Sequence, residues 1–148
     1  MTFFLFIYHL GMIQQIFLPF YFGGGGRMGS GTQNMPWIHV KDLSGIIVHA
    51  IENEKVEGVL NGVAPEIITN QEFVKSFASA LNRPSFFPLP DFVWNTVFGE
   101  ERATMITKGQ KVTPKRTLES GYQYRFPTIS QACGEFSKLF YEDSDGEK

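Results

Sequence analysis

The spacing of apolar residues changes from strand-like to helical within residues 36–45. Bulky and β-branched side chains predict a strand over residues 37–40, and Pro36 marks its start because proline donates no hydrogen bond to a sheet. Asp42 falls in the first turn of the helix that follows, where the helix dipole favours a carboxylate. The apolar face predicted for this helix consists of Leu43, Ile46, Ile47, Ala50 and Ile51. A strand that passes directly into a helix is typical of α/β proteins.

Three more elements are expected before residue 83. A helix over residues 11–22 contains Pro19, which should end or kink it. Residues 59–64 read as a buried strand between a turn and a proline. Thr69 and Glu72 have the spacing of a capping box, in which each satisfies a backbone N–H of the other, and they predict the start of a helix ending near Asn82.

The C-terminal half is expected to be mostly helical. Short helices are predicted over residues 91–99 and 100–108, after an extended proline-rich segment. The last helix is predicted over residues 128–140, with Cys133 buried on its apolar face as a free thiol. Residues 141–148 are expected to form an acidic, disordered tail.

Composition narrows the function classes. The 148 residues carry a net charge of −2 without a long basic run, which argues against a nucleic-acid partner. Residues 1–10 are apolar, but they have neither the features of a signal peptide nor the length of a membrane span. The single cysteine is typical of a reducing compartment, so we expect a soluble intracellular protein of the cytoplasm or mitochondrion.

The candidate chemistry in the residues themselves is weak. The glycine-rich stretch fits the dinucleotide fingerprint as Gly24-x-Gly26-x-x-Gly29, but a strand instead of a helix is expected to follow it, so we predict no cofactor-binding residues here. His39 and His49 are too isolated to predict a metal site. A basic cluster near Tyr122 and Tyr124 is interpreted as a solvated surface, although it could hold an anion. It comprises Lys108, Lys111, Lys115 and Arg116.

Several segments together resemble one family. They are Gly29-Ser30-Gly31, Pro36-Trp37-Ile38-His39-Val40-Lys41-Asp42-Leu43, Gly58-Val59-Leu60-Asn61-Gly62-Val63-Ala64-Pro65, Thr69-Asn70-Gln71-Glu72-Phe73 and Gly109-Gln110-Lys111-Val112-Thr113-Pro114-Lys115-Arg116. Their order and spacing, over about residues 11–140, resemble the C-terminal half of the epimerase-family atypical short-chain dehydrogenase/reductases. The resemblance implies an α/β fold, α+β for the isolated piece, namely the C-terminal portion of an extended short-chain dehydrogenase/reductase with few short strands and packed helices.

The resemblance also implies a domain division. Residues 1–10 would be an atypical N-terminus, residues 11–65 the end of the NAD(P)-binding epimerase-like domain, and residues 66–140 a C-terminal substrate-side domain before the tail. NADP or NAD is implied for full-length members, whose N-terminal Rossmann half is missing from this chain. By position in the family, the residues expected to line a substrate pocket are Gln33, Trp37, His39 and Asn61.

The chain departs from its relatives in its chemistry. Related enzymes transfer protons with a Tyr-x-x-x-Lys pair, and none of the five tyrosines here is followed by lysine at the fourth position. We therefore expect no catalytic residues, no cofactor bound by this chain alone, and a truncated member of the family that is not catalytic by itself. The alternatives are a half-enzyme that needs a Rossmann partner and a non-enzymatic protein-binding module.

An exposed apolar surface is expected if the Rossmann half is absent. It would include the phenylalanines near the N-terminus, namely Phe3, Phe4, Phe6, Phe17, Phe20 and Phe22. Such a surface predicts either docking of a Rossmann half or self-association.

Overall fold

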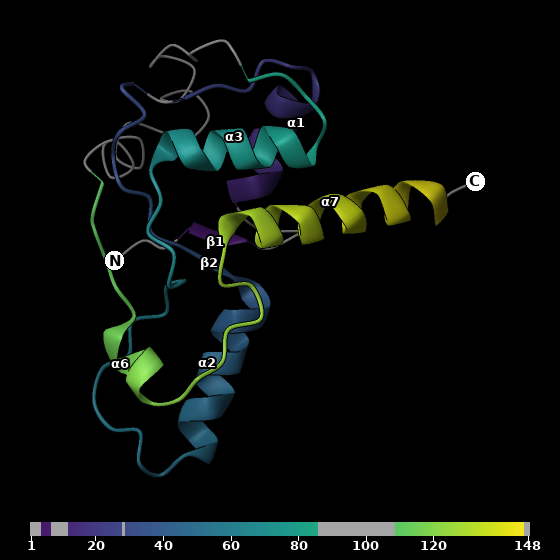
Figure 1. Cartoon of the computed structure of the whole chain (residues 1–148). Coiled ribbons are helices and arrows are strands. Elements are labelled where there is room, and N and C mark those ends of the chain that lie inside the picture. Colours follow the sequence, from purple (N-terminus) through teal and green to yellow (C-terminus); the bar gives the residue numbers. More distant parts are fainter. Residues whose placement is uncertain (1–3, 7–11, 28, 86–108, 147–148) are drawn as a thin grey trace.

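The structure, a computed structural model, describes residues 4–6, 12–27, 29–85 and 109–146. The described elements are β1 (Phe4–Phe6), α1 (Met12–Tyr21), β2 (Trp37–His39), α2 (Val40–Glu52), α3 (Asn70–Ala80), α6 (Lys115–Glu119) and α7 (Ile129–Gly146). Helices α1, α3 and α7 gather at one end, α2 and α6 lie at the other, and the two strands run between them (Figure 1). This mixed architecture with few short strands confirms the predicted fold class. The helices predicted over residues 91–99 and 100–108 lie outside the described residues.

The two strands form a parallel pair in which Phe4 is opposite Trp37 and Phe6 is opposite His39. Strand β2 confirms the prediction for residues 37–39. Val40 already belongs to α2, because the side chain of His39 accepts a hydrogen bond from the backbone N–H of Lys41 and so caps the helix. Strand β1 was not predicted, since three apolar residues carry no periodicity that would distinguish a strand.

The predicted first helix is confirmed as α1, and it ends at Tyr21, two residues after Pro19. Helix α7 begins at Ile129, close to the predicted start, but it continues to Gly146. The prediction of a disordered tail is therefore wrong for residues 141–146, which continue the helical backbone of α7.

The strand predicted over residues 59–64 does not form. Val63 and Ala64 are buried, and the N–H of Ala64 donates to the carbonyl of Trp37 at 2.7 Å, but Val59 is 76% exposed. A strand requires a continuous ladder of backbone hydrogen bonds to a neighbour, and this segment meets β2 at its last residue. The correct description is an extended segment that touches the sheet.

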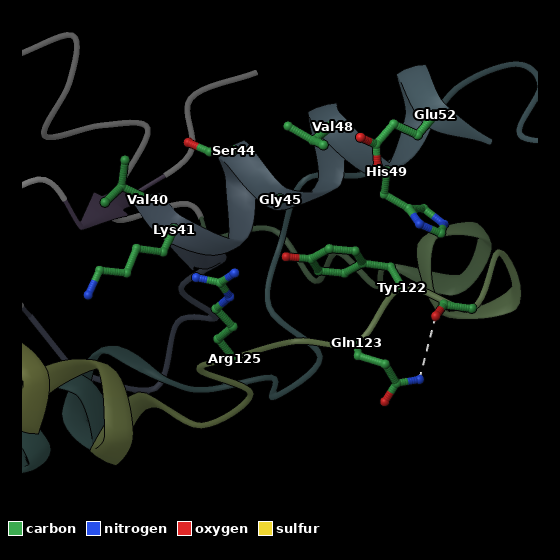
Figure 2. Close-up of a pocket in the computed structure, with 11 residues that line it drawn as sticks. Val40, Lys41, Ser44, Gly45, Val48, His49, Glu52, Tyr122, Gln123 and Arg125 are labelled. Carbon is green, nitrogen blue, oxygen red and sulfur yellow. Dashed lines mark hydrogen bonds between the residues drawn. The ribbon is translucent and has the colours of Figure 1, made fainter.

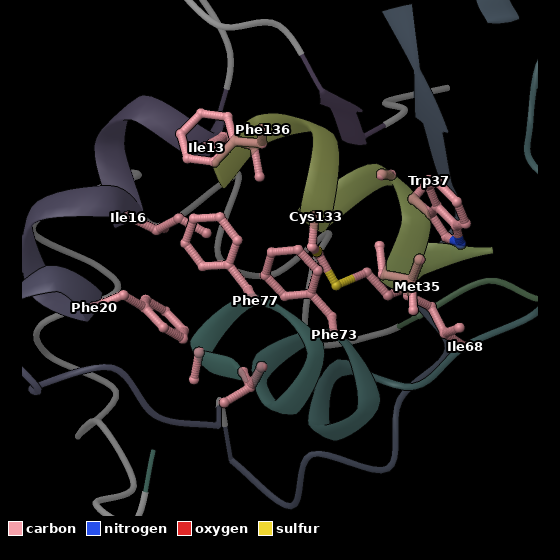
Figure 3. Packing of buried hydrophobic residues seen from close by; sticks show 14 of the residues in the cluster. Ile13, Ile16, Phe20, Met35, Trp37, Ile68, Phe73, Phe77, Cys133 and Phe136 are labelled. Carbon is pink, nitrogen blue, oxygen red and sulfur yellow. The ribbon is translucent and has the colours of Figure 1, made fainter. Parts of the chain in front are cut away.

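The main hydrophobic core lies between α1, α3 and α7 (Figure 3). Phe77 is central to it, with its ring 5.1 Å from that of Phe20 and 5.6 Å from that of Phe136. Cys133 is a free, fully buried thiol, as predicted. The cluster consists of Ile13, Ile16, Phe20, Met35, Trp37, Ala64, Ile68, Phe73, Val74, Phe77, Ala78, Leu81, Ile129, Ala132, Cys133 and Phe136.

The predicted phenylalanine surface and the predicted apolar face of α2 both differ from what the structure shows. Phe20 is fully buried and so does not belong to the exposed phenylalanine surface, whereas Phe22 is 81% exposed. On α2 the buried side chains are Asp42 and Ile46, while Ile47 and Ile51 of the predicted apolar face are exposed. The helix is turned this way because its Asp42 side packs against residues 122–126, far along the chain.

The capping box at the start of α3 is confirmed. The Thr69 hydroxyl accepts the N–H of Glu72, and the Glu72 carboxylate accepts the N–H of Thr69 at 2.7 Å. The backbone N–H and the hydroxyl of Thr69 both donate to the Glu72 carboxylate, and these two hydrogen bonds lower the pKa of Glu72 because they favour its ionised form. Local sequence therefore sets the start of α3.

Candidate functional site

The carboxylate of Asp42 is the centre of a buried polar cluster at the start of α2. It accepts the backbone N–H groups of Arg125 and Phe126 at 2.7 and 2.9 Å, and the hydroxyl of Tyr122 at 3.2 Å. Because Asp42 is buried, its carboxylate loses its hydrogen bonds to water, and these three protein donors take their place. The cluster ties α2 to the segment before α7.

Tyr122 lies against α2 at Gly45 (Figure 2). A Cβ at Gly45 would collide with the Tyr122 hydroxyl, so glycine is needed for this approach. Burial, followed by the negative charge of Asp42, raises the pKa of Tyr122 to about 12. Burial likewise raises the pKa of Tyr124, whose hydroxyl donates to the carbonyl of Val63, to about 12. Both tyrosines are protonated near neutral pH and act as hydrogen-bond donors.

His39 links β2, α2 and this cluster. Its Nδ1 accepts the N–H of Lys41 at 3.2 Å, and its ring stacks on Phe126 with the centroids 4.0 Å apart. Burial lowers the pKa of His39, and the charge of Asp42 opposes that effect only in part. The imidazole is therefore neutral near pH 7, and because Nδ1 is the acceptor, the ring proton is on Nε2.

The residues expected to line a substrate pocket are spread over the structure. Trp37 is buried in the core, where its indole N–H donates to the carbonyl of Glu66 at 3.1 Å. Asn61 donates through its side chain to the carbonyl of Thr113 at 3.1 Å, and its own carbonyl accepts the Thr117 hydroxyl.

Gln33 uses its carbonyl to accept the N–H of Asn70 at 3.0 Å, at the start of α3. Trp37 borders a very small pocket together with Asn34 and Gln110, but Gln33, His39 and Asn61 do not line it. The role of these four residues toward a substrate stays a prediction.

An open groove of about 680 Å³ runs along α2. One wall is formed by α2 itself, and the other by the segment that includes Tyr122, Gln123 and Arg125 (Figure 2). Within this groove His49 makes hydrogen bonds through Nε2 to the carbonyl and the hydroxyl of Ser120, at 3.1 and 3.2 Å. Sequence patterns did not indicate this groove, because its two walls are about seventy residues apart in the sequence.

Glu66 connects α7 to β2, a role that the sequence did not indicate. Its side chain accepts the N–H of Ile129 at the start of α7, while its carbonyl accepts the indole of Trp37. A carboxylate at a helix N-terminus is favourable because of the helix dipole. The available signal, an acidic residue between two buried segments, does not identify a partner sixty-three residues away.

The described residues do not fit the pyrophosphate of a dinucleotide. Such a group needs free backbone N–H groups at the N-terminus of a helix that follows the glycines. Here β2 is the next element after the glycine-rich loop, and the loop itself covers the start of α3. The carbonyls of Gly31 and Gln33 accept the N–H groups of Gln71 and Asn70 at 2.9 and 3.0 Å.

Other site classes find little support in the part of the chain that the structure describes. It contains no group of three or more histidine, cysteine, aspartate or glutamate residues that could hold a metal ion. None of its helices has the length and apolarity needed to cross a membrane. In the predicted basic cluster, Lys115 pairs with Glu119 at 3.8 Å, and Arg116 donates to the carbonyl of Glu57.

Comparison with known proteins identifies the relatives. The family described as "Domain of unknown function (DUF1731)" matches residues 89–136. The chain is 52% identical over 126 residues to the epimerase family protein SDR39U1 of Bos taurus, a match that covers 84% of this chain and 43% of the relative. The chain thus spans less than half the length of this relative.

Solved structures agree with these matches. The structure of human epimerase family protein SDR39U1 (isoform 2) with NADPH has a TM-score of 0.85 and 49% identity, covering 91% of this chain and 46% of that one. UDP-N-acetylglucosamine 4-epimerase from Bacillus cereus shares only the fold, with a TM-score of 0.52 and 14% identity over 91% of this chain and 43% of that one.

The sequence segments, the mixed fold and the relatives all indicate one assignment. Over most of its length the chain resembles the C-terminal portion of the epimerase family proteins.

Proposed function

We propose that this chain supplies the substrate-side part of an NAD(P)-dependent oxidoreductase or epimerase-like protein and depends on a nucleotide-binding half for its cofactor. The observation that carries the proposal is its similarity to the human protein solved with NADPH, of which it covers 46%. A Rossmann half would occupy the part of the relative that this chain does not match. NADP(H) is the cofactor that this similarity favours.

The chemistry of the described residues supports a dependent role. The start of α3 is already covered by backbone carbonyls, so no phosphate cradle is available there. Tyr122 and Tyr124 remain protonated near neutral pH, and neither is followed by lysine at the fourth position. Proton transfer of the kind that related enzymes perform would therefore need groups from the other half.

Calorimetric titration with NADPH and with NADH tests the proposal. The chain alone should bind neither cofactor with micromolar affinity. Co-expression with the nucleotide-binding half of the bovine relative should give a complex that binds NADPH. Micromolar binding by the chain alone would overturn the dependent role, and a stable complex that binds neither cofactor would overturn the assignment as the substrate-side part.

A second candidate function is a protein-binding module without catalysis. It is favoured by the exposed apolar residues of α2, where Ile47, Val48 and Ile51 are each at least half exposed. We further propose a reducing intracellular compartment, the cytoplasm or the mitochondrion, because Cys133 is a free buried thiol. Localisation of a fluorescent fusion of the chain tests the compartment.

A further inference from the structure

Helix α2 presents an exposed apolar face next to the groove. Ile47 is 54% exposed, Val48 50% and Ile51 77%. With 3.6 residues per turn, these three side chains lie on the side of the helix opposite to the buried Asp42 and Ile46. Three large apolar side chains on adjacent turns form a surface that favours association.

Opposite charges flank this apolar face. Lys41 and Arg125 lie near the N-terminal end of α2, and Glu52 lies at its C-terminal end (Figure 2). The helical rise places Lys41 and Glu52 about 16 Å apart along the axis. Lys41 pairs with Glu135 at 2.6 Å. Among the described residues, neither Arg125 nor Glu52 has an ion pair, and both line the groove.

We propose that this face binds the same face of a second copy of the chain, with the two α2 helices antiparallel around a two-fold axis near Ile47 and Val48. Antiparallel packing places the N-terminal end of one helix beside the C-terminal end of the other. Arg125 of each copy then lies beside Glu52 of the other copy, and the apolar side chains meet at the centre.

A second copy fits better than an unrelated partner because the face is complementary to itself. A two-fold interface uses one patch twice, so the patch must carry both members of each contact. One side of α2 carries Lys41, Val48 and Glu52. In a two-fold dimer this side of one copy faces the same side of the other copy. One helix face is smaller than the roughly 800 Å² per partner of a standard interface, so we expect a micromolar dimer.

Disulfide cross-linking tests the geometry. A cysteine in place of Val48 lies near the two-fold axis, so Val48→Cys should form a covalent dimer on mild oxidation with copper phenanthroline. Leu18→Cys is the matched control, because Leu18 is also exposed but lies on α1, and the native Cys133 is buried. Equal cross-linking of the two variants, or none of Val48→Cys, would overturn the proposal.

Charge reversal tests the pairing in sedimentation velocity experiments on the whole chain. Arg125→Glu and Glu52→Arg should each weaken dimerisation about tenfold, because each places like charges together, and the double variant should recover it. Recovery of the dimer affinity in the double variant distinguishes a specific two-fold interface from non-specific association of the apolar face. A chain that stays monomeric to millimolar concentration, or single variants that dimerise like the wild type, would contradict the inference.

Discussion

The carboxylate of Asp42 accepts the hydroxyl of Tyr122 at 3.2 Å, across eighty positions of sequence. The same carboxylate holds two successive backbone N–H groups at Arg125 and Phe126. One acidic side chain thereby fixes the segment that forms a wall of the groove and leads into α7.

Asp42→Asn is expected to lower the free energy of unfolding by about 1 to 3 kcal/mol, because the amide removes the charge and faces a donor toward backbone donors. Urea unfolding followed by circular dichroism measures the change. Glu54→Gln, which alters an exposed acidic residue, should leave the midpoint where it was. Equal midpoints for the two variants would show that the cluster does not stabilise the fold.

Phe20→Ala is expected to destabilise the protein by about 3 to 5 kcal/mol, because it leaves a cavity beside Phe77. Phe22→Ala is the matched control, since Phe22 lies two residues further along and is exposed. Its effect should be small, within about 0.5 kcal/mol. Thermal melts compare the two, and similar melting temperatures would contradict the packing of α1.

Thr69→Ala is expected to cost about 1 kcal/mol of stability, because the N–H of Glu72 loses its acceptor at the start of α3. Thr113→Ala provides the comparison, since Thr113 has an exposed position before α6. In denaturant melts the free energies of unfolding of the two variants should differ by about 1 kcal/mol, the contribution of one N-cap. The capping assignment fails if Thr113→Ala costs as much.

His39 should make stability depend on pH in mildly acidic solution. Its pKa in the folded chain lies below the ordinary value of 6.5, because burial disfavours the charged ring. As the pH falls, the His39 ring of the unfolded chain is therefore protonated at a higher pH than that of the folded chain. The stability that neutral His39 contributes is present above about pH 6.5 and is lost as the pH falls below that value.

His39→Asn removes the titration and keeps an oxygen that can cap α2. Urea melts between about pH 7.5 and about pH 5.5 should show a smaller loss of stability for this variant than for the wild type. The comparison concerns the slopes, because the variant also loses the ring contact with Phe126. Parallel slopes would exclude His39 as the group responsible.

Local interactions explain what could be predicted from the sequence. The capping box at Thr69 and Glu72 and the passage from strand to helix after Pro36 both depend on residues within a few positions of each other. Because these contacts close within one or two turns, spacing alone determines them. The order of the motifs also sufficed to indicate the family.

Distant contacts decided the remaining features. An amphipathic pattern predicts that α2 has an apolar face, but burial depends on which segment covers it. Residues 122–126 contact the side of α2 that carries Asp42. Val59 is apolar yet exposed, and neither of the two described strands pairs with it. The sequence by itself therefore determined where the capped helices begin and which family the chain resembles. The tertiary structure decided which faces are covered, because burial and buried hydrogen bonds require partners that local spacing does not specify.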